Sequence, residues 1–115
     1  MPLLKLETTV AIPDDKRKSL LSALSRIVAE TIGKPEKYVM VTASQSAILM
    51  SAAPGPAAFV DVRSIGGLNN DVNRELSRKV CVLLDDSAGI PKDRVYLNFT
   101  DVPAAQWGWN SETFG

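Results

Sequence analysis

The pattern of apolar and polar positions occurs twice along this chain. GKPEKYVMV (residues 33–41) and GIPKDRVYL (residues 89–97) share one layout, in which glycine, any residue, proline and two polar residues precede an apolar run. The same offset of 56 residues aligns the apolar positions 20, 24, 27 and 28 with positions 76, 80, 83 and 84. The chain therefore contains an internal repeat of two similar units.

Each unit reads as strand, helix and strand. Apolar and polar residues alternate in the manner of strands at about 3–9, 38–44, 58–65 and 94–100. Apolar residues at helical spacing predict helices at about 14–31 and 70–87. We expect Asp14 and Asn70 to cap the N-termini of these helices, and Gly33 and Gly89 to end them with a positive φ.

Two right-handed βαβ units side by side predict a single α/β domain over residues 1–115. Its four strands form one mixed sheet, and both helices cover the same face. The repeat units span about 2–50 and 58–105, a loop rich in proline and glycine joins them at 51–58, and a C-terminal segment follows at 106–115.

The two faces of this sheet differ in character. The residues predicted to face the helices are apolar: Leu4, Leu6, Val39, Val41, Val60, Val62, Val95, Leu97 and Phe99. The opposite face mixes charged, polar and apolar side chains: Lys5, Glu7, Met40, Thr42, Asp61, Arg63, Tyr96, Asn98 and Thr100. Two interpretations are open, a solvated face or the partly polar interior of a symmetric oligomer.

The amino-acid composition limits which ligands this chain can bind and which groups can transfer protons. The 13 basic and 13 acidic residues balance, which argues against nucleic-acid binding, and no apolar stretch is long enough to span a membrane. The lone Cys81 suits a reducing compartment and no secretion signal is recognisable, so we expect a cytoplasmic protein. The chain has no histidine, so proton transfer must use a carboxylate, a lysine, a tyrosine or the amino terminus.

Pro2 is open to two interpretations. Proline is tolerated as the first residue of a strand, where no ladder hydrogen bond is lost. Removal of Met1 would instead make Pro2 an amino-terminal secondary amine, and such amines begin near pKa ~8. The SIGGLNN segment (residues 64–70) and Lys34, near the end of the first helix, could each face an anion, although a turn and a helix-dipole role also explain them.

A set of short motifs resembles the tautomerase superfamily, specifically the family of macrophage migration inhibitory factor and D-dopachrome tautomerase. The resemblance covers nearly the whole chain. Its residues are Pro2 after the initiator Met, Gly33-Lys34-Pro35 with Tyr38, Ser64-Ile65-Gly66, Asp93-Arg94-Val95-Tyr96 with Asn98, Gly108-Trp109-Asn110 and Thr113-Phe114.

The resemblance implies a cofactor-free homotrimer that interconverts keto and enol forms of small aromatic α-keto acids such as phenylpyruvate, with dopachrome-type compounds as a further class. Pro2 would be the catalytic base once Met1 is removed, and Lys34 and the Ile65 backbone N–H would hold substrate oxygens. A neighbouring subunit would supply Tyr96 and Asn98 to the pocket. An aromatic rim of Tyr38, Trp109 and Phe114 would complete it. Burial and the charge of Lys34 would lower the pKa of the Pro2 amine, as a general base at neutral pH requires.

Two family features are missing from this sequence. Ala57 and Val60 replace a Cys-x-x-Cys pair credited with thiol–disulfide activity, so we expect that activity to be absent. The segments 10–13 and 44–46 lack the charged pair of a chemokine-like receptor motif, which leaves receptor binding open. The alternatives to an enzyme are a cytokine-like binding or signalling trimer with incidental turnover, and a small-molecule carrier.

Overall fold

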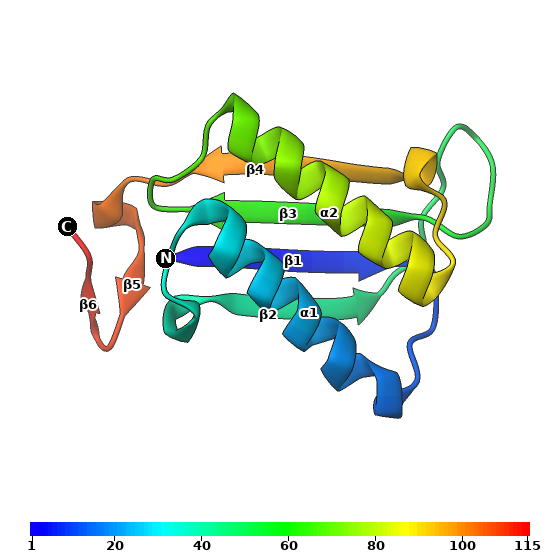
Figure 1. Cartoon of the computed structure of the whole chain (residues 1–115), viewed down its shortest axis with the longest axis horizontal. Coiled ribbons are helices and arrows are strands. Elements are labelled where there is room, and N and C mark those ends of the chain that lie inside the picture. Colours follow the sequence, from blue (N-terminus) through cyan, green and yellow to red (C-terminus); the bar gives the residue numbers. More distant parts are fainter.

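Two strand–helix–strand units build the molecule. The computed structural model describes all residues from 1 to 115 (Figure 1). The first unit contains β1 (Pro2–Thr8), α1 (Asp14–Ile32) and β2 (Met40–Gln45), and the second contains β3 (Ala58–Ser64), α2 (Asn70–Ala88) and β4 (Val95–Asp101). The internal repeat predicted from the sequence is thus present as two units of equal element order.

One four-stranded sheet joins the two units in the order β2-β1-β3-β4. The strands run parallel within each unit and antiparallel where β1 meets β3 at the centre. Both helices lie on one face of this sheet (Figure 1). The predicted α/β class, the mixed sheet and the placement of the helices are confirmed.

The core lies between the sheet and the two helices. Leu4, Leu6, Val60 and Val62 project from the central strands and are fully buried. Opposite them the helices contribute Leu20, Leu24, Val28, Leu76, Val80 and Leu84. Burial of each such side chain contributes about 1.5–3 kcal/mol. This apolar contact fixes which face of β1 and β3 points away from the helices.

The predicted helix caps were wrong by one residue. Asn69, not Asn70, caps α2, and its Oδ1 accepts the Val72 N–H at 2.9 Å. Pro13 precedes α1 without a side-chain cap, and Asp14 is already helical, where it forms an ion pair with Arg17 at 2.9 Å. A capping oxygen must precede the first helical residue to reach a free N–H, and the apolar pattern does not resolve that single step.

The glycine ends of both helices are confirmed. Gly33 and Gly89 have φ angles of 80° and 66°, in the left-handed region. After each glycine a proline leads into one turn of 3-10 helix, η1 (Glu36–Tyr38) or η2 (Lys92–Arg94). These turns delay β2 to Met40 and β4 to Val95, so Val39 lies just outside its predicted strand.

The loop between the two units is held by one side chain. Arg94 donates three hydrogen bonds to carbonyl oxygens of this loop, at 2.8 Å to Pro56, 3.2 Å to Met50 and 2.9 Å to Ala53. Two residues in the tight turn, Ser51 and Ala52, have positive φ angles. Arg94 therefore connects the second unit to the loop that precedes it.

The C-terminal segment folds back toward the start of the chain. After η3 (Ala104–Gln106), β5 (Gly108–Trp109) and β6 (Glu112–Thr113) form a small hairpin. The Phe114 N–H donates to the Trp107 carbonyl at 3.1 Å and closes the segment. Figure 1 shows both ends of the chain at the same end of the sheet. None of the helices has the length and apolar content needed to cross a membrane.

The sheet face away from the helices carries a mixed set of side chains, as predicted. Met40 and Tyr96 are 62% and 67% exposed, and both are large and apolar or aromatic. Ion pairs join Lys5 to Glu7 at 3.4 Å and Arg63 to Asp61 at 3.0 Å on the same face.

Candidate active site

A cavity of about 580 Å³ opens where the first residues of the chain meet the C-terminal segment. Its wall is formed by the start of β1, by η1 and the start of β2, by one residue of β3 and by residues 102–114. Most of the wall is apolar, in keeping with small-molecule sites, which are concave and carry few polar groups. The cavity therefore depends on residues from both ends of the sequence.

Three aromatic side chains form one side of this cavity. Tyr38 meets Trp109 edge to face, with ring centroids 6.1 Å apart, and Trp109 stacks on Phe114 at 5.8 Å. Such pairs are more favourable than their buried area alone implies. The structure thus brings together Tyr38, Trp109 and Phe114, the three residues predicted to form an aromatic rim.

Pro2 is part of the cavity wall. It is buried, and it pairs in register with Ser64 as the first residue of β1. Met1 precedes it, so the Pro2 nitrogen belongs to an amide. The Ile65 N–H donates to the Met1 carbonyl at 3.4 Å. Met1 therefore occupies the space next to Pro2 and the Ile65 backbone donor.

The electrostatic surroundings of this terminus favour a neutral amine. Burial, followed by the positive charge of Lys34, lowers the pKa of the Met1 amino group from its ordinary value of 8.0. Both effects act against the protonated form. An amine at this position is thereby more available as a base than an ordinary amino terminus.

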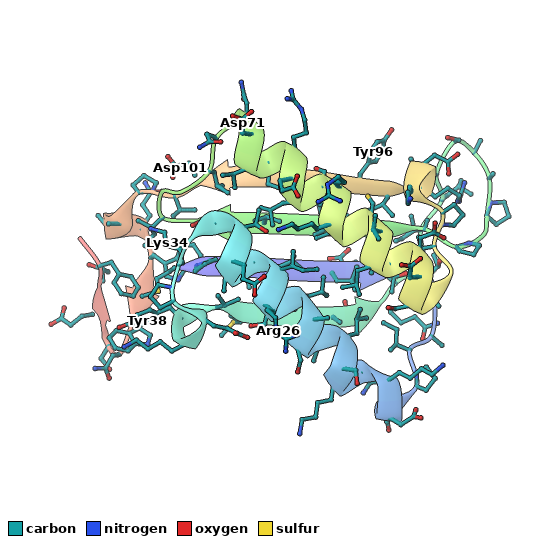
Figure 2. All side chains as sticks on the ribbon, viewed as in Figure 1. Arg26, Lys34, Tyr38, Asp71, Tyr96 and Asp101 are labelled. Carbon is teal, nitrogen blue, oxygen red and sulfur yellow. The ribbon has the colours of Figure 1, made fainter.

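Lys34 and Ile65 lie beside the amino terminus, outside the wall of the cavity itself. Lys34 follows Gly33, the residue that ends α1, and its N–H donates to the Ala29 carbonyl at 3.1 Å. Its stem passes close to Gly67. Figure 2 shows Lys34 and Tyr38 at the same end of the sheet.

The single chain does not bring Tyr96 and Asn98 to this cavity. Both lie on β4, where Tyr96 pairs with Phe59 and Asn98 pairs with Asp61. Figure 2 shows Tyr96 near the opposite end of the sheet from Lys34. The two side chains are exposed on the sheet face away from the helices.

Sequence reasoning missed several residues of the wall, among them Lys37, Met40, Arg63 and Trp107. Lys37 places its Nζ 5.0 Å from the centre of the Tyr38 ring. Met40 and Arg63 are both register partners of Leu3, which also lines the cavity. Strand alternation placed Met40 and Arg63 on one face, but only the register shows that they meet at the cavity.

The structure offers no candidate metal centre, because no three His, Cys, Asp or Glu side chains gather closely enough to hold an ion. The positions that would carry a Cys-x-x-Cys pair are Ala57 and Val60, both fully buried in the core. Cys81 is half-buried on α2, where burial raises the pKa of its thiol.

Comparison with known proteins decides the family. Residues 1–115 match the family described as macrophage migration inhibitory factor (MIF). Macrophage migration inhibitory factor of Rattus norvegicus is 35% identical over 118 residues, covering 99% of each chain. The homolog from Trichuris trichiura is 34% identical over 115 residues, covering 99% of this chain and 100% of its own.

This chain belongs to the MIF family. Solved structures agree across the full length of the fold. The MIF homologue from Prochlorococcus marinus is 42% identical with a TM-score of 0.93, covering 98% of this chain and 99% of its own. The MIF-like protein of Entamoeba histolytica is 31% identical with a TM-score of 0.94, and 98% of each chain is covered. The family resemblance inferred from the motifs is confirmed.

Proposed function

We propose that this MIF-family protein is a cofactor-free tautomerase that interconverts keto and enol forms of phenylpyruvate-like α-keto acids, with dopachrome-type compounds as a further substrate class. The observation that carries the proposal is the partly buried amino terminus beside Lys34, in the wall of an aromatic cavity, where the pKa of the Met1 amino group is lowered. We expect this activity in the cytoplasm, the compartment that suits a lone cysteine.

In this mechanism the chain begins at Pro2 after removal of Met1. The neutral Pro2 amine takes a proton from the carbon next to the keto group, and the electron pair of the broken C–H bond moves to give an enolate. The protonated Pro2 amine then gives this proton to the enolate oxygen, which yields the enol and restores the neutral amine. A positioned general base of this kind typically contributes ~10²–10⁴-fold to the rate.

Lys34 and Ile65 would stabilise the charge that develops on the enolate and hold the carboxylate of the substrate. In the structure the Ile65 N–H is directed at the Met1 carbonyl, so removal of Met1 leaves a backbone donor next to Pro2 for a substrate oxygen. Donors fixed in advance around a developing oxyanion are among the largest contributions to catalysis. The rings of Tyr38, Trp109 and Phe114 suit an aryl side chain.

A homotrimer would complete the site. Tyr96 and Asn98 lie on a face of β4 that is exposed in the single chain, and neither lines the cavity of its own subunit. A neighbouring subunit that packs against this face would place them in a cavity, and the large exposed surfaces of Met40 and Tyr96 favour such packing.

The test is the enol–keto conversion of phenylpyruvate, followed by absorbance, with protein whose loss of Met1 is verified by intact mass. A Pro2→Gly variant and a form that retains Met1 are the controls. We expect turnover by the Met1-free protein and a loss of roughly 10²–10⁴-fold in both controls. Absence of turnover by verified Met1-free protein would overturn the proposal and favour a binding protein.

A further inference from the structure

The charged side chains of the cavity all have the same sign. Lys37 and Arg63 are the two charged residues of its wall, and neither Asp nor Glu contributes to it. Lys34 adds a third positive charge beside the amino terminus. A site with this distribution favours anionic ligands, since the low-dielectric walls concentrate the field of the cations.

Arg63 is held in place with part of its donor capacity unused. Its Nε and Nη2 donate to Asp61 Oδ2 at 3.3 Å and 3.0 Å. The Asp61 side chain is only 16% exposed, whereas that of Arg63 is 53% exposed. No hydrogen bond involves Nη1 of Arg63 in the structure, so Asp61 orients the guanidinium and leaves one nitrogen for another acceptor.

Arg63 and Lys34 approach the cavity end of the sheet from opposite faces. Lys34 follows α1 on the helix side, whereas Arg63 projects from the face of β3 that carries the mixed side chains. Val62 and Ser64, the neighbours of Arg63, are buried on the helix side. Because the two cations lie on opposite faces of the sheet, a carboxylate that Lys34 holds beside Pro2 does not also contact Arg63. Arg63 is then free to bind a different part of the ligand.

We propose that Arg63 is a specificity-determining residue that binds a second anionic group of the substrate, on the side of the cavity away from Lys34. The preferred substrate class is then an α-keto acid with a second carboxylate. The guanidinium suits this role because its planar donors match carboxylate geometry. The inference rests on the proposed function for the position of the keto acid.

The test uses two ligands that do not react, so that it is independent of turnover. 3-Phenylpropionate carries one carboxylate, and 3-(4-carboxyphenyl)propionate carries a second at the far end. Both tryptophans of the chain, Trp107 and Trp109, line the cavity, so quenching of intrinsic fluorescence reports binding there. The quantity compared is the ratio of the two dissociation constants, measured with Met1-free protein at one ionic strength.

Three variants separate a direct contact from general charge. Arg63→Gln removes the guanidinium, and Lys37→Gln removes the other cation of the wall. Lys5→Gln makes the same change in net charge on the same sheet face, outside the wall of the cavity. The circular dichroism spectrum and urea unfolding midpoint of each variant, together with its elution volume on size exclusion, show that the fold and assembly are intact.

We expect the wild-type protein to bind the dicarboxylate about tenfold more tightly than the monocarboxylate, as one charge-assisted hydrogen bond allows. Arg63→Gln should bring this ratio close to one, and Lys5→Gln should leave it unchanged. A ratio that survives in Arg63→Gln, or that is lost only in Lys37→Gln, would overturn the assignment. If Arg63 distinguishes the dicarboxylate from the monocarboxylate but the protein has no tautomerase turnover, the proposed function is disproved and the assignment of Arg63 as an anion-binding residue stands.

Discussion

Gly67 is the position where the loop after β3 meets the end of α1, and alanine there should disturb both stability and Lys34. A Cβ at Gly67 would lie 2.6 Å from Ile32 Cγ2 and 3.4 Å from Lys34 Cε, on a backbone with φ of +81°. Ile32 is 8% exposed, and its β-branched side chain has few alternative rotamers in a helix. The methyl group that Gly67→Ala adds therefore has no free space.

The neighbouring glycine provides a matched control. Gly66 has φ of +70°, and a Cβ there would meet nothing within 4 Å. Left-handed backbone costs a non-glycine residue about 1–2 kcal/mol, and overpacking adds about 1–3 kcal/mol. We therefore expect Gly66→Ala to lower the free energy of unfolding by about 1–2 kcal/mol and Gly67→Ala to lower it by about 2–5 kcal/mol.

Urea unfolding followed by tryptophan fluorescence measures this difference. All samples are compared at one protein concentration, because association would link stability to concentration. Gly67→Ala should also lower kcat/KM for phenylpyruvate more than Gly66→Ala does, since relief of the clash with Ile32 must shift the end of α1, next to Lys34. Equal losses of stability in the two variants would refute the steric argument, and the left-handed backbone would then account for the whole effect.

Two further changes probe the loop and the base. Arg94→Met removes the donors for three loop carbonyls. We therefore expect faster amide hydrogen exchange over residues 50–56 and a free energy of unfolding that is lower by about 1–3 kcal/mol. Unchanged exchange in this loop would contradict the role of Arg94. Lys34→Met should raise the pKa of the amino terminus, because a cation that disfavours the protonated amine is lost. The neutral amine is the active form, so we expect kcat/KM of Met1-free protein to rise with pH as the Pro2 amine loses its proton, and we expect Lys34→Met to move the midpoint of that rise upward. A midpoint that stays in place or moves downward would show that Lys34 does not act on this amine.

Local periodicity was sufficient to predict the fold because the helix and strand patterns agree with the packing of this chain. Leu4, Leu6, Val60 and Val62 alternate with polar residues and are buried as that alternation requires. The starts of β2 and β4 were predicted too early. Tyr38 continues the apolar run that leads into β2, but Pro35 is followed first by a 3-10 turn. The alternation of apolar and polar residues does not distinguish such a turn from the start of a strand.

The cavity was only partly predictable because its residues lie far apart in the sequence. Tyr38, Trp109 and Phe114 were grouped through the family motifs, and no property of the three residues alone would have joined them. Arg63 escaped notice for the opposite reason. Its place in the wall depends on the antiparallel register that pairs it with Leu3, and register is set by the fold as a whole.

The closure of one cavity by residues 2 and 114 has a practical consequence for anyone who wishes to label this protein. A tag placed before Pro2 would enter the cavity, as Met1 does. Gly115 packs so closely against the Ala105 backbone that a Cβ there would lie 2.6 Å from the Ala105 nitrogen, so a fusion at that end would begin from a packed position beside the hairpin. Dyes and surface attachment points belong instead on the solvent-facing side of α1, where Lys18 and Arg26 are exposed.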